Sequence, residues 1–499
     1  MKRSAWTFTA ALFISVTTDD AAAQTRRPNI VVIVADDMGY ADIGIHGSKD
    51  IPTPNIDALA AEGVRFTDAY VSGPYCGPTR AGLLTGKYPQ RFGHEFNLGG
   101  RAHRDVGLPV EQVTIADRLK AADYRTALIG KWHLGVAPRF FPLRRGFDEF
   151  YGFLAGGHSY VNVGPDAAPI YDGNEIVREA PYLTEAFADR AVEFIKRNRA
   201  QPFFLYLAFN AVHVPLQATE KYLARAQHIS DPTRRTYAAM LMAMDDGIGK
   251  TLAALRSEGL DENTLVFFFS DNGGPIGIGP RGQEIWNGSS NAPLRGSKGT
   301  TWEGGIRVPF IVRWKGRIAA GRTESHSIIQ LDVMPTALAA AGIPIPAAWK
   351  LDGVSLLPLL TGDSSRVPHD ALYWRLGGNM AIRQGDWKLV KVAEGGANDT
   401  TPPTLASAQL FNLKVDIGET NNLAETNPAK RRELLDAWQR WNRELAKPAW
   451  PPPGPAPASI RGVPGSSRSK RESMSARRRG VRHVALTGEP SSRPPGMQF

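Results

Sequence analysis

Cysteine is almost absent from this chain, because Cys76 is the only one in 499 residues. A single cysteine excludes any internal disulfide, even in an oxidising compartment. Long hydrophobic runs are missing as well. The run Ala5–Val16 is too short to span a bilayer, and no later segment is apolar for long enough. We therefore expect no stable membrane anchor, and Cys76 needs an explanation other than a disulfide.

Most of the net charge of +10 comes from the two ends of the chain rather than from residues 28–450. Residues 451–499 contain nine Lys and Arg and two Asp and Glu (+7), and residues 1–27 contain four and two (+2). The remaining 28–450 therefore carry only +1. A nearly neutral body excludes nucleic-acid binding as the main function.

The N-terminus has the composition of a signal peptide over residues 1–23. Lys2 and Arg3 precede the apolar run Ala5–Val16, and Ala21–Ala23 is typical of a cleavage site. No cysteine follows directly, which excludes a lipoprotein anchor. We expect an exported protein, periplasmic or extracellular.

Residues 28–345 alternate between buried-strand and helix patterns, which predicts an α/β domain with a large mixed, mostly parallel sheet between helices. The predicted strands are 30–35, 203–209, 264–270 and 308–314, and the predicted helices are 55–62, 114–122, 183–198 and 237–257.

Residues 346–450 have a different pattern, with short antiparallel strands at 371–374, 379–383 and 387–390 and a closing helix at 428–447. They predict a smaller C-terminal α+β subdomain. Residues 451–499 form a basic Pro-, Ser- and Arg-rich tail, which we expect to be disordered.

Each of the two clearest buried strands ends in a pair of oxygen-bearing side chains. Asp36-Asp37 follow the strand at 30–35, and Asp271-Asn272 follow the strand at 264–270. Asp and Asn are also common turn residues, but the repetition of the pattern favours a shared site, since parallel strands end at one edge of the sheet. Such oxygens suit Ca²⁺ or Mg²⁺ better than zinc.

Cys76 lies in the run Cys76-Gly-Pro-Thr-Arg80, where a helix could begin at Pro78. A cysteine at a helix N-terminus beside a cation favours reactive chemistry, although most lone cysteines are only buried small apolar residues. Further polar residues follow strands or Gly-rich segments: Lys131 and His133 in Gly130–Gly135, His213 after the strand at 203–209, and Lys298 in a loop before the strand at 308–314. Together, these cationic and imidazole side chains would surround a metal ion and Cys76. Such a set indicates a binding site for an ester of a tetrahedral oxyanion.

These motifs together resemble the sulfatase family. Cys76–Arg80 with Thr85-Gly86 is similar to the family's first signature and Gly130–Gly135 to its second, and the similarity extends from Asn29 to about Ala424. The branch that it most resembles is that of N-acetylgalactosamine-6-sulfatase and the arylsulfatases. The resemblance implies an alkaline-phosphatase-like fold and a sulfuric ester hydrolase.

The resemblance also implies that Cys76 is oxidised to formylglycine by a maturation enzyme that reads Cys76, Pro78 and Arg80 in the unfolded chain. The aldehyde hydrates to a gem-diol, one hydroxyl attacks sulfur, and the second drives out sulfate as the aldehyde reforms.

The resemblance assigns roles to the other residues too. Asp36, Asp37, Asp271 and Asn272, with the modified Cys76, would hold one Ca²⁺. Arg80 and Lys131 would stabilise the diolate, and His133 would be the base for the second hydroxyl. His213 and Lys298 would contact the sulfate and protonate the leaving oxygen, and His158 is a candidate substrate contact.

Two alternatives remain from the sequence. One is a phosphatase or phosphodiesterase of the same superfamily, and the other is a secreted carbohydrate-binding protein without activity. Loops at 90–106, 154–182 and 275–292 are candidates for setting specificity, and the expected substrate is a sulfated small molecule or glycan.

Overall fold

The computed structural model describes residues 27–99, 101–161, 168–177, 181–277, 285–393 and 405–452. The predicted signal peptide lies outside these residues, and so does the predicted tail except for Pro451 and Pro452. Both stay predictions. No helix in the described ranges combines the length and the apolar composition needed to cross a bilayer.

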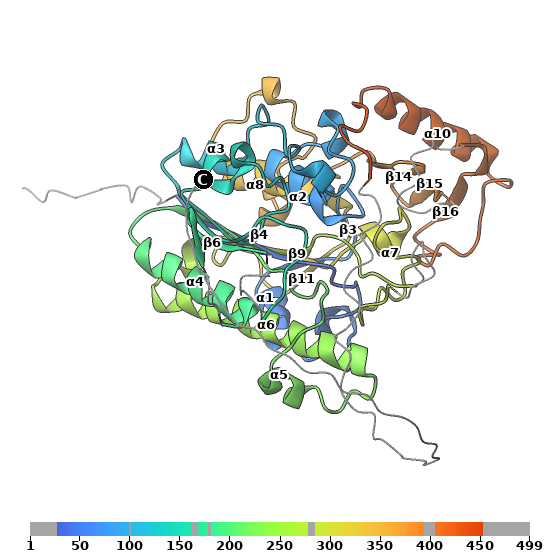
Figure 1. Cartoon of the computed structure of the whole chain (residues 1–499). Coiled ribbons are helices and arrows are strands. Elements are labelled where there is room, and N and C mark those ends of the chain that lie inside the picture. Colours follow the sequence, from blue (N-terminus) through green and yellow to red (C-terminus); the bar gives the residue numbers. More distant parts are fainter. Residues whose placement is uncertain are drawn as a thin grey trace, which may run out of the picture. The chain divides into compact units, whose positions relative to one another are not determined.

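A large sheet forms the centre of the fold (Figure 1). Its strands are β1 (Asn29–Ala35), β2 (Val64–Phe66), β4 (Arg125–Lys131), β5 (Glu149–Phe153), β6 (Ile170–Asp172), β7 (Glu175–Val177), β8 (Phe203–Ala208), β9 (Thr264–Ser270), β10 (Phe310–Arg313) and β11 (Arg322–Glu324). Their order is β11-β2-β10-β9-β1-β8-β4-β5-β6-β7. The central strands are parallel, whereas β10 runs antiparallel to β9 and β2. The predicted mixed, mostly parallel sheet is therefore confirmed.

Helices cover both faces of this sheet (Figure 1). On one face lie α1 (Pro54–Ala61), α4 (Leu183–Arg197) and α6 (Pro232–Ser257), and on the other α2 (Cys76–Thr85), α3 (Ile115–Lys120) and α8 (Val333–Ala340). Side chains of β1 alternate between the two cores: Val31 and Ile33 pack with the first set of helices, and Ile30 and Val32 with the second. Burial on both faces explains why β1 has no polar residue between Asn29 and Asp36.

Several helix boundaries differ from the prediction, and three of the differences have a bearing on the local structure. Helix α6 begins at Pro232 rather than 237, because the Asp231 side chain caps it by accepting from the amide of Arg234. Helix α2 begins at Cys76 rather than Pro78, which therefore lies in the first turn, where its missing N–H leaves no hydrogen bond unmade. The closing helix α10 spans Pro428–Asn442 and ends before the predicted 447.

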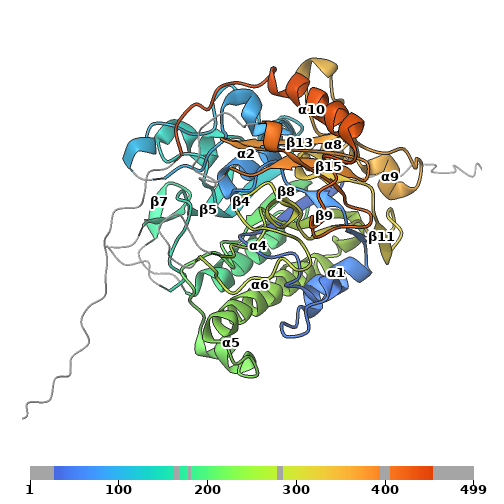
Figure 2. The same ribbon diagram turned by 90° about the vertical axis from the view of Figure 1, so that its right-hand side faces the viewer.

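The C-terminal part is a four-stranded antiparallel sheet with α10 lying across it (Figure 2). Its strands are β13 (Leu372–Leu376), β14 (Asn379–Gln384), β15 (Trp387–Lys391) and β16 (Gln409–Asn412). Their core also takes in Tyr70, Ile306 and Ile329 from the first part of the chain. The smaller α+β unit is thus confirmed and packs against these segments of the first part, while a boundary at 345/346 stays a prediction. The remaining short elements are β3 (Ala69–Tyr70), β12 (Ile328–Ile329), α5 (Glu220–Arg225), α7 (Glu303–Ile306) and α9 (Leu357–Thr361).

A buried ionic cluster joins the two parts. Lys388 of β15 lies 2.8 Å from carboxylate oxygens of both Glu303 and Glu419, and all three side chains are fully buried. Glu303 also accepts a hydrogen bond from the Tyr70 hydroxyl at 2.7 Å, and its amide donates to Glu419 at 2.8 Å. This cluster fixes helix α7, which directly follows the loop that contains Lys298.

We expect Lys388→Met to lower the free energy of unfolding by about 3–5 kcal/mol, because it leaves two buried carboxylates with one cation fewer. Urea denaturation at constant pH measures the loss. The exposed Lys414→Met is the control and should change stability by less than about 0.5 kcal/mol. Equal unfolding midpoints for the two variants would contradict the proposed role of Lys388.

Candidate active site

Four oxygen-bearing side chains meet at the carboxyl edge of the main sheet. Strands β1 and β9 pair in register, with Ala35 opposite Ser270, so Asp36 and Asp271 leave the sheet side by side. The backbone amide of Asp37 donates to Asp271 Oδ1 at 3.2 Å, and the side-chain Nδ2 of Asn272 donates to Asp37 Oδ1 at 2.7 Å. All four side chains are buried. The structure therefore brings together the two pairs that the sequence singled out.

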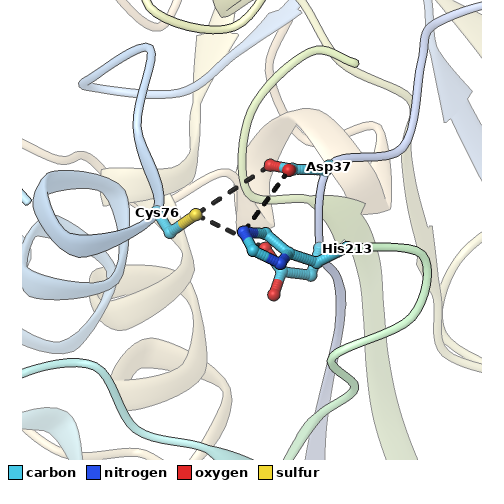
Figure 3. A group of neighbouring side chains, drawn as sticks. Asp37, Cys76 and His213 are labelled. Atoms are coloured by element: carbon cyan, nitrogen blue, oxygen red, sulfur yellow. Dashed lines mark hydrogen bonds and ion pairs between the residues drawn. The ribbon is translucent and has the colours of Figure 1, made fainter. Parts of the chain in front are cut away.

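Cys76 faces this group from the first residue of α2. Its Sγ lies 3.4 Å from Asp36 Oδ1 and 3.9 Å from Asp37 Oδ1. Figure 3 shows the thiol and the His213 imidazole both turned toward the Asp37 carboxylate. Asp36, Asp37, Cys76 and His213 offer ligand atoms that all lie within 4.8 Å of one another.

Three cations balance the three carboxylates. Lys131, at the end of β4, lies 2.6 Å from Asp36 Oδ2. Arg80, one turn along α2 from Cys76, donates to Asp271 Oδ2 through Nε and Nη2 at 3.0 and 2.7 Å. Lys298 contacts both Asp37 oxygens at 2.6 and 2.8 Å and lies 3.4 Å from Cys76 Sγ. The formal charges of the six groups cancel, so the cluster is stable in the interior only as a unit.

Two histidines border the cluster in neutral form. His133 has a left-handed backbone (φ 57°), and its Nε2 lies 3.0 Å from the Leu98 carbonyl oxygen, so Nε2 carries the proton. Nδ1 is buried and has no partner among the described residues. Burial lowers the pKa of His133 well below its usual value, and the charge of Lys131 lowers it further. The orphaned Nδ1 is thus available as a proton acceptor.

His213 marks the more open side of the cluster. Its Nε2 lies 3.7 Å from Asp37 Oδ2, and its Nδ1 lies 2.6 Å from the Val214 carbonyl oxygen. Burial lowers the pKa of His213, although Asp36 and Asp37 oppose that effect. The His213 side chain is 19% exposed and that of Lys298 is 11% exposed, whereas Arg80 and Lys131 are fully buried. A ligand would therefore reach the cluster past His213 and Lys298.

The Cys76 thiol itself is a poor nucleophile in this setting. Burial raises its pKa, Asp271 raises it further, and Lys131 and Lys298 only partly oppose these effects. The helix start and the nearby cation, which the sequence presented as favouring a reactive cysteine, do not produce a thiolate here. The surroundings of Cys76 therefore favour the protonated thiol over the thiolate.

The donor set fits a divalent cation with a preference for oxygen. Asn272 Oδ1 is buried and lacks a hydrogen-bond partner in the described part of the chain. Burial raises the pKa of Asp271 to about 6, and the negative charge of Asp36 adds to the shift. The Asn272 oxygen has no partner, and the ionised form of Asp271 is disfavoured. Both observations indicate that a bound cation beside these two residues would stabilise them. Carboxylate and amide oxygens are the ligands that Ca²⁺ and Mg²⁺ take.

His158 is placed differently from the other predicted residues. Its Nδ1 and Nε2 lie 2.6 Å from the carbonyl oxygens of Ser159 and Ala168. A neutral ring can donate to only one of these oxygens, so at least one ring nitrogen is committed to the loop, and the predicted substrate contact stays a prediction. The neighbouring Gly156 does reach the site, since a Cβ there would lie 2.6 Å from His133 Nε2.

Sequence reasoning missed two polar groups that support the cluster. The Tyr206 hydroxyl lies 3.4 Å from Arg80 Nη1, and Asn97 Oδ1 accepts from the amide of Gly77 at 2.8 Å. Tyr206 lies inside an apolar strand, and Asn97 lies in a loop that the sequence indicated only for specificity. No signal in the sequence distinguished either residue.

Comparison with known proteins gives consistent matches. The family model for sulfatases matches residues 28–343, and one for the C-terminal part of N-sulphoglucosamine sulphohydrolase matches residues 297–433. N-acetylgalactosamine-6-sulfatase of Canis lupus familiaris is 37% identical over 74% of this chain and 72% of its own length. Human arylsulfatase A is 36% identical over 83% and 87%. The crystal structure of Ps i-CgsB in complex with k-i-k-neocarrahexaose has a TM-score of 0.78 and 38% identity, covering 85% of this chain and 95% of that one.

Because the thiol is buried and protonated, unmodified Cys76 should react with iodoacetamide at pH 8 far more slowly in the folded protein than in urea. The mass of the intact protein reports the reaction directly, since the chain has no other cysteine. The unfolded chain serves as the control. Equal rates in the two states would show that the thiol is accessible and ionised.

Proposed function

The chain belongs to the sulfatase family, and we propose that it hydrolyses a sulfate monoester of a sulfated sugar or polysaccharide fragment, with a formylglycine made from Cys76 and one Ca²⁺. Membership of the family makes it a sulfuric ester hydrolase related to the arylsulfatases and N-acetylgalactosamine-6-sulfatase. The observation that carries the proposal is the protonated Cys76 thiol, held among Asp36, Asp37 and Lys298. After conversion, the side chain at position 76 would face the carboxylates that can hold a metal ion. It would also face Lys298, which can bind the negatively charged sulfate group.

Burial of the signature supports modification before folding. Cys76 is 1% exposed and Arg80 is fully buried, and Pro78 lies inside the first turn of α2. A maturation enzyme could not read these side chains in the folded protein. We therefore propose that this partner acts on the unfolded chain, which is consistent with export in an extended form to the periplasm or the extracellular space.

The bound groups would supply two kinds of chemistry that the encoded side chains lack. Hydrated formylglycine supplies a pair of hydroxyls on one carbon, and Ca²⁺ supplies a Lewis acid that polarises a sulfate oxygen. Asp36, Asp37, Asp271 and Asn272 would hold the cation.

The chain's own residues perform the remaining steps. Arg80 and Lys131 lie beside the nucleophile position and stabilise negative charge that develops there. His133 accepts a proton at Nδ1, because its Nε2 is committed to the Leu98 carbonyl. Lys298, on the open side, binds sulfate oxygens and delivers a proton to the leaving oxygen. His213 can share this role when its Nε2 is protonated, because Nε2 is the ring nitrogen that faces the site.

A cavity beside the site can take the body of the substrate. It has a volume of about 550 Å³ and is lined by Phe153, Leu154, Tyr171 and Arg104, among others. Leu154 connects it to the site, because its carbonyl accepts from the amide of His133 at 3.2 Å. This volume suits a sugar residue rather than a bare sulfate ion. The complex of Ps i-CgsB with a neocarrahexaose supports a sulfated glycan as the substrate class.

The first test concerns Cys76. Protein made with a maturation enzyme should yield a Cys76 peptide that is lighter than encoded, reacts with hydrazides, and accompanies turnover of sulfated sugars, including galactose and N-acetylgalactosamine 6-sulfates. Cys76→Ser should lose nearly all multiple turnover, because a single hydroxyl can accept sulfate but cannot expel it. Active protein that contains only the free thiol would refute the mechanism. Faster cleavage of a phosphate ester than of the sulfate ester of the same alcohol would favour the phosphatase alternative.

The second test concerns the metal. Elemental analysis should find one calcium per chain, and Ca²⁺ at a hundred times its Kd should stabilise the protein by about 2.7 kcal/mol. Asp37→Asn should abolish this gain, because it removes a central carboxylate while keeping its shape. The exposed Asp363→Asn is the matched control and should keep the gain. Stoichiometric zinc, or stabilisation that survives Asp37→Asn, would contradict the proposed calcium site.

A further inference from the structure

The loop Gly93–Leu98 contacts two groups of the active site through hydrogen bonds. Asn97 Oδ1 accepts from the amide of Gly77 at 2.8 Å, directly after the nucleophile position on α2. The Leu98 carbonyl accepts from His133 Nε2 at 3.0 Å and so selects the ring nitrogen that carries the proton. The position of this loop therefore sets both the start of the nucleophile's helix and the tautomer of the neighbouring base.

The end of the described chain holds this loop from behind. The Trp450 indole Nε1 donates to the Phe96 carbonyl at 3.1 Å, and the Ala449 amide donates to the Gly93 carbonyl at 2.9 Å. Trp450 is buried, packs with Phe96 and Leu376, and meets the His94 ring edge-on with centroids 4.7 Å apart. The bond to Phe96 lies one residue before Asn97, so a shift at Trp450 passes directly to the cap on Gly77.

The other contacts of the loop hold its far end. Glu95 accepts from Arg375 Nη2 at 2.6 Å and from the amide of Gly377 at 2.8 Å, both in the β13–β14 hairpin. The His94 ring nitrogens are buried and have no hydrogen-bond partner among the described residues. Among the hydrogen bonds of the described chain that reach this loop from the C-terminal segment, the Trp450 bond is nearest to Asn97 and Leu98 in sequence.

We propose that Trp450 is a positioning residue of the enzyme, which fixes the loop Gly93–Leu98 and through it the nucleophile position at Cys76 and the ring of His133. This inference rests on the proposed function, because it assigns an effect on turnover to a residue outside the reacting groups. Trp450 acts through the loop, by its hydrogen bond to Phe96 and its contact with the His94 ring. Its loss should therefore slow the chemical step and leave the binding groups Lys298 and His213 in place.

The chain contains a matched control in Trp438. This residue is also buried in the C-terminal part, and its Nε1 donates to a backbone carbonyl, that of Trp374, at 2.9 Å. Trp374 lies on β13, away from the loop Gly93–Leu98 in sequence. Trp450→Phe and Trp438→Phe each keep an aromatic ring and remove one buried N–H···O=C bond, so their costs in stability should be similar.

The experiment measures kcat and KM of the full-length, matured variants on a small sulfate ester. Trp450→Phe should lower kcat about tenfold with KM nearly unchanged, because misplacement by a fraction of an ångström slows a positioned reaction. Trp438→Phe should keep kcat within about twofold of wild type. Wild-type kcat in folded Trp450→Phe, or equal losses in the two variants, would overturn the proposal.

Hydrogen exchange tests the same link without using activity. Amides in peptides that cover residues 76–79 and 93–98 should exchange faster in Trp450→Phe than in wild type, and those peptides should be unchanged in Trp438→Phe. Unchanged exchange at 76–79 in Trp450→Phe would overturn the positional link. Failure of the wild type to cleave any sulfate ester would instead refute the proposed function, while the exchange result would still decide the role of Trp450.

Discussion

The rest of the site depends on a balance of charge in the protein interior. Three carboxylates, Asp36, Asp37 and Asp271, lie buried at one edge of the sheet, and three buried or nearly buried cations face them. None of these groups could be ionised there alone, because desolvation of a single charge costs several kcal/mol. Each therefore requires the others, and the elements that supply them have to be held together. This requirement explains why strands β1, β4 and β9, helix α2 and the loop around Lys298 converge on one point.

The small C-terminal sheet supplies no reacting group, but it contacts and supports two segments that border the site. Lys388 ties α7 to the C-terminal sheet and so supports the segment that contains Lys298. Arg375 and Trp450 hold the loop Gly93–Leu98, which also borders the site. The antiparallel sheet with its helix thus acts as a scaffold for two loops of the catalytic domain. A buried ion pair and buried hydrogen bonds suit this task, because they have a preferred geometry that apolar packing lacks.

The sequence around Cys76 favours a reactive thiolate, but its surroundings in the folded chain favour the protonated thiol. A cysteine at a helix start beside Arg80 and Lys131 has the partners that normally favour a thiolate. In the folded chain, burial and the nearby carboxylates outweigh those partners and keep the thiol protonated. The same surroundings suit an oxygen nucleophile beside a bound cation. These surroundings are consistent with the proposed conversion of Cys76, because they suit an oxygen nucleophile better than a thiolate.

The sequence by itself determined the sheet class, the strands β1 and β9, and the two oxygen-bearing pairs Asp36-Asp37 and Asp271-Asn272, because these follow from local patterns. A strand buried on both faces must be continuously apolar, and a polar pair directly after it must lie at the sheet edge. Only the tertiary structure decided how these pairs combine. It placed Lys131 against Asp36 and Lys298 against Asp37, set the His158 ring between two backbone carbonyls, and brought Asn97 beside Gly77 and Trp450 beside Phe96. The physical reason is that desolvation, pairing and hydrogen-bond direction depend on neighbours that lie up to several hundred residues away in the chain.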